Sequence, residues 1–193
     1  MLRITHYGES VLTRKGTEIT VFDEALLNLA DAMVDTMYEA DGIGLAAQQI
    51  DQPIMLCVVD VAPEGAEVDF AYELDGKTPP IDLIMPMALV NPRILKVSED
   101  TDVLEEGCLS FPGIRGEVRR PLAIEVTYQD LEGASHNLKC DGILARCIQH
   151  EVDHLNGILF TDRMDSKTRK SLKTELRELK EATLASIPSV RDQ

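Results

Sequence analysis

The spacing of apolar residues predicts three helices along the chain. Between residues 23 and 40, apolar side chains recur every three or four positions, as in an amphipathic helix, at Leu26, Ala30, Met33 and Met37. The same spacing runs through residues 141–155 and again through residues 167–185, where Pro188 is expected to end the helix. Two of these helices therefore lie in the last third of the chain.

Apolar and β-branched runs predict strands between the first two helices. Residues 54–61 form a nearly continuous apolar run, and residues 87–97 form a second strand in which Pro92 marks a kink or an edge position. Residues 123–129 alternate between apolar and polar, and a turn leads into a return strand that ends near Cys140. Two segments rich in Gly, Pro or acidic residues are expected to be loops, at residues 41–49 and 62–80.

The composition indicates one globular domain. The chain has 193 residues, of which 44% are hydrophobic and 27% are charged, as in ordinary soluble proteins. No apolar run is long enough to cross a membrane, and the N-terminus lacks the apolar region of a secretory signal. We therefore expect a cytoplasmic protein without membrane contact, in which thiols stay reduced.

The negative charge is unevenly distributed. The formal net charge is −15, and residues 60–106 carry 12 acidic and 3 basic side chains. Phosphates are repelled by such a surface, so DNA is not an expected partner. Residues 166–181 carry six basic and three acidic side chains. This basic segment is either a solvated helix face or a docking surface for an acidic partner.

The helix at residues 141–155 contains an H-E-x-x-H motif. At 100° per residue, His150 and His154 lie on one face of the helix together with Ile143 and Cys147. Two imidazoles at this spacing are suited to bind one metal ion, and Glu151 lies where it can act as a base toward a metal-bound water. The motif therefore predicts a metal site on the buried face of this helix.

The third metal ligand distinguishes the possible classes of enzyme. The metzincin pattern fails because Phe160 occupies its final position, whereas a zincin endopeptidase could use Glu175 or Glu178 from the basic helix. The other candidate is a thiolate, and no two of the four cysteines form a CxxC pair. Cys108 lies between glycines in a loop, where it can approach a metal. Cys57 and Cys147 look like core residues, and Cys140 is undecided.

Three segments together resemble the peptide deformylase family. They are residues 42–49 (GIGLAAQQ), residues 106–110 (EGCLS) and residues 149–157 (QHEVDHLNG), complete and in the family's order. The resemblance, with the pattern of elements, implies an α+β fold in which short antiparallel β-sheets surround a central metal-binding helix, with a C-terminal helix packed outside. It implies one catalytic domain over residues 1–165, with an inserted acidic loop at 62–86, followed by a helix and tail at 166–193.

The resemblance also implies an activity and a metal. The activity is hydrolytic removal of the N-formyl group from the N-terminal methionine of newly synthesised polypeptides, which releases formate. By resemblance, Cys108, His150 and His154 hold Fe²⁺, with Zn²⁺, Ni²⁺ or Co²⁺ as substitutes. A metal-bound water attacks the formyl carbon, and Glu151 transfers the proton from that water to the leaving amine. The alternative hypothesis is a binding protein without catalytic activity, in which the metal serves only to stabilise the fold.

The remaining expected site residues follow from the same motifs. The Gln49 amide and the Leu109 backbone N–H are expected to stabilise the oxyanion. The substrate is expected to contact five residues, Ile43, Gly44, Gly107, Arg115 and Cys147. Arg146 stands where the family more often has an apolar residue beside the methionine pocket. The basic C-terminal helix is expected to contact the ribosome.

Overall fold

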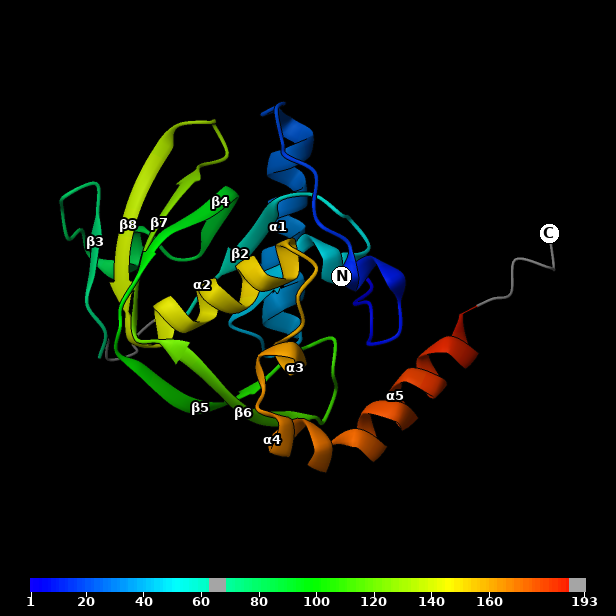
Figure 1. The fold of residues 1–193 in the computed structure, drawn as a ribbon. Coiled ribbons are helices and arrows are strands. Elements are labelled where there is room, and N and C mark those ends of the chain that lie inside the picture. Colours follow the sequence, from blue (N-terminus) through cyan, green and yellow to red (C-terminus); the bar gives the residue numbers. More distant parts are fainter. Residues whose placement is uncertain (63–68, 188–193) are drawn as a thin grey trace.

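The structure, a computed structural model, describes residues 1–62 and 69–187 (Figure 1). Its centre is the helix α2, Gly142–Leu155, against which an antiparallel six-stranded sheet packs. The strand order is β1-β2-β4-β7-β8-β3, so some strands that lie side by side are far apart in the sequence. The strands are β1 Gly44–Ala46, β2 Leu56–Val59, β3 Tyr72–Leu74, β4 Met87–Val97, β7 Ala123–Gln129 and β8 Ser135–Asp141.

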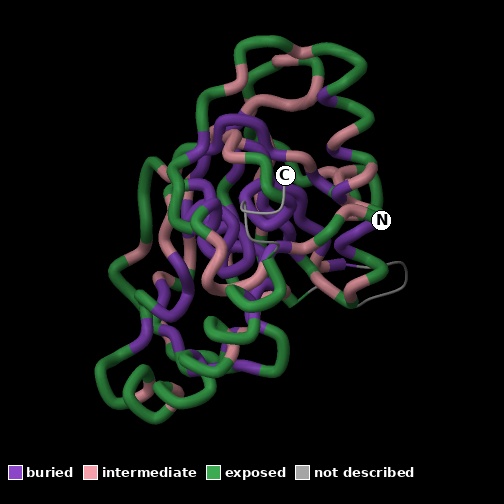
Figure 2. The backbone as a smooth tube through the Cα atoms, turned by 90° about the vertical axis from the view of Figure 1, so that its right-hand side faces the viewer, coloured by how far each residue is buried: buried purple, intermediate pink, exposed green. Residues whose placement is uncertain are grey.

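Helix α2 is buried along almost its whole length. Every residue from 144 to 155 is buried, and buried segments gather at the centre of the molecule in Figure 2. Leu144, Ile148 and Leu155 pack against inward-facing strand residues such as Val126 and Leu138. The helix therefore has little freedom to move, and side chains on it are held in fixed positions.

Helix α1, Glu24–Glu39, covers the opposite side of strands β1 and β2. The Asp23 side chain accepts a hydrogen bond from the Leu26 backbone N–H (3.1 Å) and caps the helix N-terminus. Met33 and Met37 on α1 are fully buried and belong to the same apolar cluster as Leu45 of β1. Residues 44–46 thus lie between two helices, and all three are buried.

A separate two-stranded hairpin and the C-terminal helices form the other part of the molecule. The hairpin consists of β5, Thr101–Gly107, and β6, Arg115–Pro121. The hairpin packs on two short helices, α3 (Phe160–Arg163) and α4 (Ser166–Ser171). Helix α5 (Lys173–Ser186) extends from α4 along the outside of the molecule (Figure 1). Short 3₁₀ turns complete the elements at Ser10–Thr13, Ala47–Ile50 and Ile81–Leu83.

The α+β fold prediction is confirmed. Of the two alternatives for Pro92, the edge position is wrong because β4 lies between β2 and β7, and the structure has an irregularity at Pro92. The register of β4 against β7 shifts between Val90 and Arg93, because proline has no N–H to donate to the ladder. The helix and strand positions expected for α1, α2, β4, β7 and β8 agree with the structure within a few residues. No helix in the described part of the chain could span a membrane.

Several boundaries expected from sequence are wrong. The expected loop at 41–49 contains β1, and the expected loop at 62–80 contains β3, which is held to β8 by ladder pairing such as Glu73↔Lys139. The expected helix at 167–185 is two helices that meet at Leu172. Residues 63–68 of the acidic loop, and the tail from Pro188 onward, lie outside the described residues.

Candidate active site

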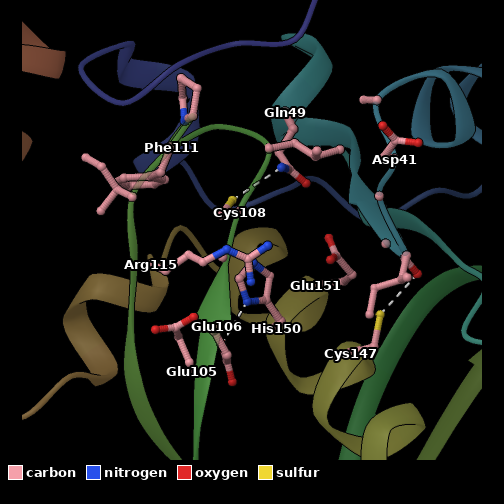
Figure 3. Close-up of a pocket in the computed structure, with 18 of the residues that line it drawn as sticks. Asp41, Gln49, Glu105, Glu106, Cys108, Phe111, Arg115, Cys147, His150 and Glu151 are labelled. Atoms are coloured by element: carbon pink, nitrogen blue, oxygen red, sulfur yellow. Dashed lines mark hydrogen bonds and ion pairs between the residues drawn. The ribbon is translucent and has the colours of Figure 1, made fainter.

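A cavity of about 670 Å³ opens beside α2 and is lined by segments that are far apart in the sequence (Figure 3). One wall is the loop at residues 40–44, which leads into β1, with Gln49 behind it. The opposite wall is residues 105–109, the end of β5 and the loop after it. His150 and Glu151 of α2 form the floor. The size is typical of a small-molecule or peptide-end site.

Cys108 and His150 line this cavity, and the buried His154 meets them next to its floor. One potential ligand atom from each lies within 4.8 Å of those of the other two, and the Cys108 Sγ is 3.2 Å from the His154 Nε2. One thiolate sulfur and two imidazole nitrogens are a donor set suited to a divalent transition metal. The residues present therefore fit the metal that the resemblance implies. Glu175 and Glu178, the rival ligands, are exposed on α5 and are not part of this group.

Glu106 fixes the orientation of His150. The His150 Nδ1 lies 2.9 Å from the Glu106 Oε2, so the Nε2 is the nitrogen left to face Cys108. Burial would raise the pKa of Glu106, but hydrogen bonds from His150 and Arg120 outweigh burial and lower the pKa to about 2. Glu106 is therefore a carboxylate at neutral pH and holds the imidazole by a charged acceptor.

Glu151 is buried next to the two histidines and has an unused oxygen. Its Oε2 is buried and has no hydrogen-bond partner among the described residues. Burial raises the pKa of Glu151 to about 7, and the neighbouring charge of His150 acts in the opposite direction. A carboxylate with such a pKa and a free acceptor is suited to take up and return a proton near neutral pH.

Gly44 leaves the space that the Glu151 carboxylate occupies. A Cβ placed on Gly44 would lie 2.4 Å from the Glu151 Oε1 and 2.9 Å from the Cys147 Sγ. Contacts that short do not occur, so any side chain at position 44 must displace Glu151 or shift β1. The glycine is therefore required by packing against Glu151, independently of any turn.

Replacing Gly44 by alanine is expected to lower kcat by on the order of 10²-fold, because the carboxylate is pushed from its position. The metal content of the purified variant should stay at the wild-type level. The comparison is Gly107→Ala, where the nearest atoms are 3.4 Å away on the flexible Arg115 side chain. Because Gly107 lines the cavity, its alanine variant is expected to raise KM and to keep kcat. Equal losses of kcat for the two variants would rule out displacement of Glu151 as the cause.

The Gln49 side chain is oriented by the backbone of β1. Its Oε1 accepts a hydrogen bond from the Ala46 N–H (2.8 Å), so the Nε2 is directed toward the cavity floor. That Nε2 lies 3.5 Å from the Cys108 Sγ and 3.2 Å from the Ser110 Oγ. The amide thus offers a hydrogen-bond donor close to the Cys108 sulfur.

The structure brings the other expected site residues to the same cavity. Ile43, Gly44, Gly107, Leu109, Arg115 and Cys147 all line it. Ile43 is partly exposed at the mouth, and its carbonyl oxygen accepts a hydrogen bond from the Cys147 Sγ (3.3 Å). Cys57 and Cys140 are buried in the sheet core, where burial raises the pKa of Cys140 to about 12. Neither thiol is suited to bind a metal there.

Sequence reasoning missed a buried network of charged side chains beneath the site. Glu106 pairs with Arg120 (2.6 Å) and with Arg146 (2.7 Å), and Arg120 also pairs with Asp153 (2.8 Å). Arg163 completes the network by binding Asp153 (2.6 Å). Glu106 lies two residues before Cys108, and Asp153 lies one residue before His154, both within the motifs of the resemblance. This proximity to the candidate ligands was the one sequence signal for the network. Nothing in the local sequence indicates that Arg120 is buried.

Comparisons with known proteins agree with the geometry. A model of the family described as polypeptide deformylase matches residues 1–170. The chain is 59% identical over 186 residues to the peptide deformylase of Opitutus terrae, covering 96% of each protein. It is 44% identical over 161 residues to that of Agrobacterium fabrum, covering 83% of this chain and 85% of that protein.

Solved structures lead to the same result. A Plasmodium falciparum peptide deformylase superimposes with a TM-score of 0.83 at 34% identity, covering 96% of this chain and 99% of that one. The Thermotoga maritima peptide deformylase gives a TM-score of 0.73 at 39% identity, covering 86% of this chain and 98% of that one. Since the family match covers most of the chain and the relatives are matched along most of their length, the chain belongs to the polypeptide deformylase family of enzymes.

Proposed function

We propose that this enzyme removes the formyl group from the N-terminal formyl-methionine of newly synthesised polypeptides and releases formate. The observation that carries the proposal is the cluster of Cys108, His150 and His154 next to one cavity, with the Glu151 Oε2 unpaired beside them. Since such substrates are made at ribosomes, the proposed compartment is the cytoplasm.

Cys108, His150 and His154 would hold the metal, which we propose to be Fe²⁺. A divalent ion bound there supplies Lewis acidity, which lowers the pKa of water and polarises the formyl carbonyl. Zn²⁺, Ni²⁺ and Co²⁺ suit the same sulfur and nitrogen ligands. Metal analysis of protein purified without oxygen identifies the ion, and a Zn²⁺-only preparation would contradict the choice of iron.

Glu151 is the proposed general base and acid. Its carboxylate accepts a proton from the attacking water, and it then donates that proton to the amine that leaves the formyl carbon. The Gln49 amide, held by Ala46, and the Leu109 backbone N–H are the proposed donors to the developing oxyanion. The Gln49 Nε2 contacts Cys108 and Ser110, the residues on either side of Leu109, so both donors lie close enough to serve one carbonyl oxygen.

The cavity walls are suited to an extended peptide. Gly44 and Gly107 lie on opposite sides, and without side chains they let a substrate backbone come close to the protein backbone. Ile43 and Cys147 offer apolar surface for the methionine side chain, and Arg115 is a donor for the peptide carbonyls. The substrate's N-terminus would then point to the floor.

The test is release of the free α-amine from formyl-Met-Ala-Ser, with formate as the second product, and acetyl-Met-Ala-Ser is the matched control measured by the same amine assay. We expect turnover of the formyl peptide and a rate at least 10²-fold lower for the acetyl peptide, since a deformylase reaction centre must exclude the larger acyl group. Equal turnover of both peptides, or turnover of neither, would contradict the proposal.

The pKa of Glu151 gives a pH dependence. Burial raises this pKa to about 7, and only the deprotonated carboxylate can accept the proton from water. The value of kcat/KM should therefore fall as pH is lowered below about 7 and level off above it. A pH–rate profile measured between pH 5 and 9 tests this, and Glu151→Gln should remove the acidic limb from whatever activity remains.

The basic C-terminal helices are proposed to contact ribosomal RNA. Arg169 and Lys170 on α4 and Lys173, Arg177 and Lys180 on α5 line one shallow groove together with Tyr7. Five cationic side chains around one groove are a suitable surface for phosphates, in contrast to the negative charge of the whole chain.

Changing Lys170, Lys173 and Arg177 together to glutamine should abolish co-sedimentation with ribosomes, because three phosphate contacts are lost. Wild-type binding should weaken by at least tenfold between 50 and 200 mM salt. The matched control changes three exposed bases elsewhere, Lys15, Arg93 and Lys96, to glutamine. Salt-independent binding, or equal loss in both triple variants, would count against this contact.

A further inference from the structure

The hairpin that carries Cys108 is not part of the sheet that packs on α2. Among the described residues, β5 pairs only with β6, and the two form a sheet of their own. Cys108 follows β5 directly, whereas His150 and His154 lie on α2. The three candidate ligands therefore come from two units of the fold, whose relative position decides whether the ligands meet.

Arg146 is one of four side chains of α2 that contact this hairpin in the described structure, beside Gln149, His150 and Asp153, and it is the one that contacts both strands. It lies one helical turn before His150 and is buried. Its Nη1 donates to the Glu106 Oε1 (2.7 Å) and to the Val118 backbone carbonyl (3.1 Å), and its Nη2 donates to the Asp102 carboxylate. One guanidinium thus contacts both strands of the hairpin and two separate residues of β5.

The Glu106 carboxylate connects Arg146 to the candidate metal ligand His150. Its Oε1 accepts from Arg120 and Arg146, and its Oε2 accepts from Arg120 and from the His150 Nδ1. Glu106 lies on β5, two residues before Cys108, which follows the strand. The carboxylate that orients one histidine is therefore also the point at which Arg146 anchors the strand leading to the cysteine.

We propose that Arg146 is a positioning residue that docks the Cys108 hairpin onto α2 and so sets the distance between the thiolate and the two imidazoles. The inference rests on the metal site described under the proposed function. A guanidinium is required at this position because one side chain must donate hydrogen bonds to Glu106, to Asp102 and to a backbone carbonyl of β6 at once. An apolar residue at position 146 would leave the hairpin without this anchor.

The experiment follows cobalt release from the holoenzyme loaded with Co²⁺ in place of iron. The thiolate-to-cobalt charge-transfer absorption reports the Cys108 bond, and its decay in excess chelator gives the release rate. We expect Arg146→Met to speed release by 10- to 100-fold, as supporting residues of metal sites do. Arg146→Lys keeps the positive charge but lacks the several N–H donors of the planar guanidinium. Its cobalt release rate should lie between those of Arg146→Met and the wild type.

Two further variants separate positioning from general stability. Asp102→Asn breaks only the outer contact of Arg146, at a partly exposed carboxylate, and should speed release less than Arg146→Met. Arg93→Met removes an exposed arginine with an exposed partner, Glu18, and should leave release unchanged. Thermal unfolding of each holoenzyme establishes that the fold is intact under the conditions of the assay.

The possible failures are distinguishable. If the wild-type chain shows no thiolate-to-cobalt absorption, the proposed metal site itself is wrong. If the wild type binds cobalt but Arg146→Met and Asp102→Asn both release it at the wild-type rate, the positioning role of Arg146 is overturned. The role is also overturned if Arg93→Met speeds release as much as Arg146→Met.

Discussion

Glu151→Gln is expected to lower kcat by about 10²- to 10⁴-fold while the variant keeps one metal ion per chain. The glutamine amide fills the same buried space beside Gly44 but cannot accept and return the proton. Loss of the buried negative charge leaves the three candidate ligands in place, since none of them is Glu151. Formate release and metal analysis on the same preparation measure both quantities.

The matched control is Glu117→Gln, the same chemical change at an exposed position on β6. It should have wild-type kcat. If Glu151→Gln retained full turnover, Glu151 would not be the base. Loss of the metal from this variant would show that the carboxylate acts on metal retention, and the account of the proton transfer would then need another group.

Cys108→Ser is expected to reduce metal content from one ion per chain to near zero and to abolish turnover. The variant replaces a soft thiolate by a hydroxyl that is a poor ligand for a divalent transition metal, and two imidazoles alone do not hold such an ion firmly. In contrast, Glu175→Gln and Glu178→Gln should retain both metal and activity, because these side chains are exposed on α5.

These three variants decide between the deformylase site and the zincin alternative. A zincin would lose its metal in one of the glutamine variants and retain it in Cys108→Ser. Ferrous protein must be handled without oxygen in this comparison, so that metal loss reports the substitution. A Cys108→Ser protein with wild-type metal content would remove the basis for the three-ligand site.

The sequence predicted the parts of the site that are local. The H-E-x-x-H spacing depends only on helix geometry, so it indicated where His150, Glu151 and His154 lie with respect to each other. The apolar periodicity was likewise sufficient to predict helices α1 and α2, because each helix buries one regular face against the sheet.

The parts that depend on long-range contacts were not predictable. Strand β6 was not predicted, since most of its residues are charged or break strands, yet Arg120 is buried and pairs with Glu106 and Asp153. Strand β1 has three residues and no alternation, since helices cover both its faces. The break at Leu172 is also set by packing, where that residue contacts the apolar cluster beneath the hairpin.

The most direct test of the account is a metal titration of chelator-treated protein in which turnover of formyl-Met-Ala-Ser is measured at each step. The account predicts no formate release without metal, a linear rise as metal is added, and saturation at one ion per chain. Turnover in the metal-free protein, or full metal occupancy without turnover, would contradict it.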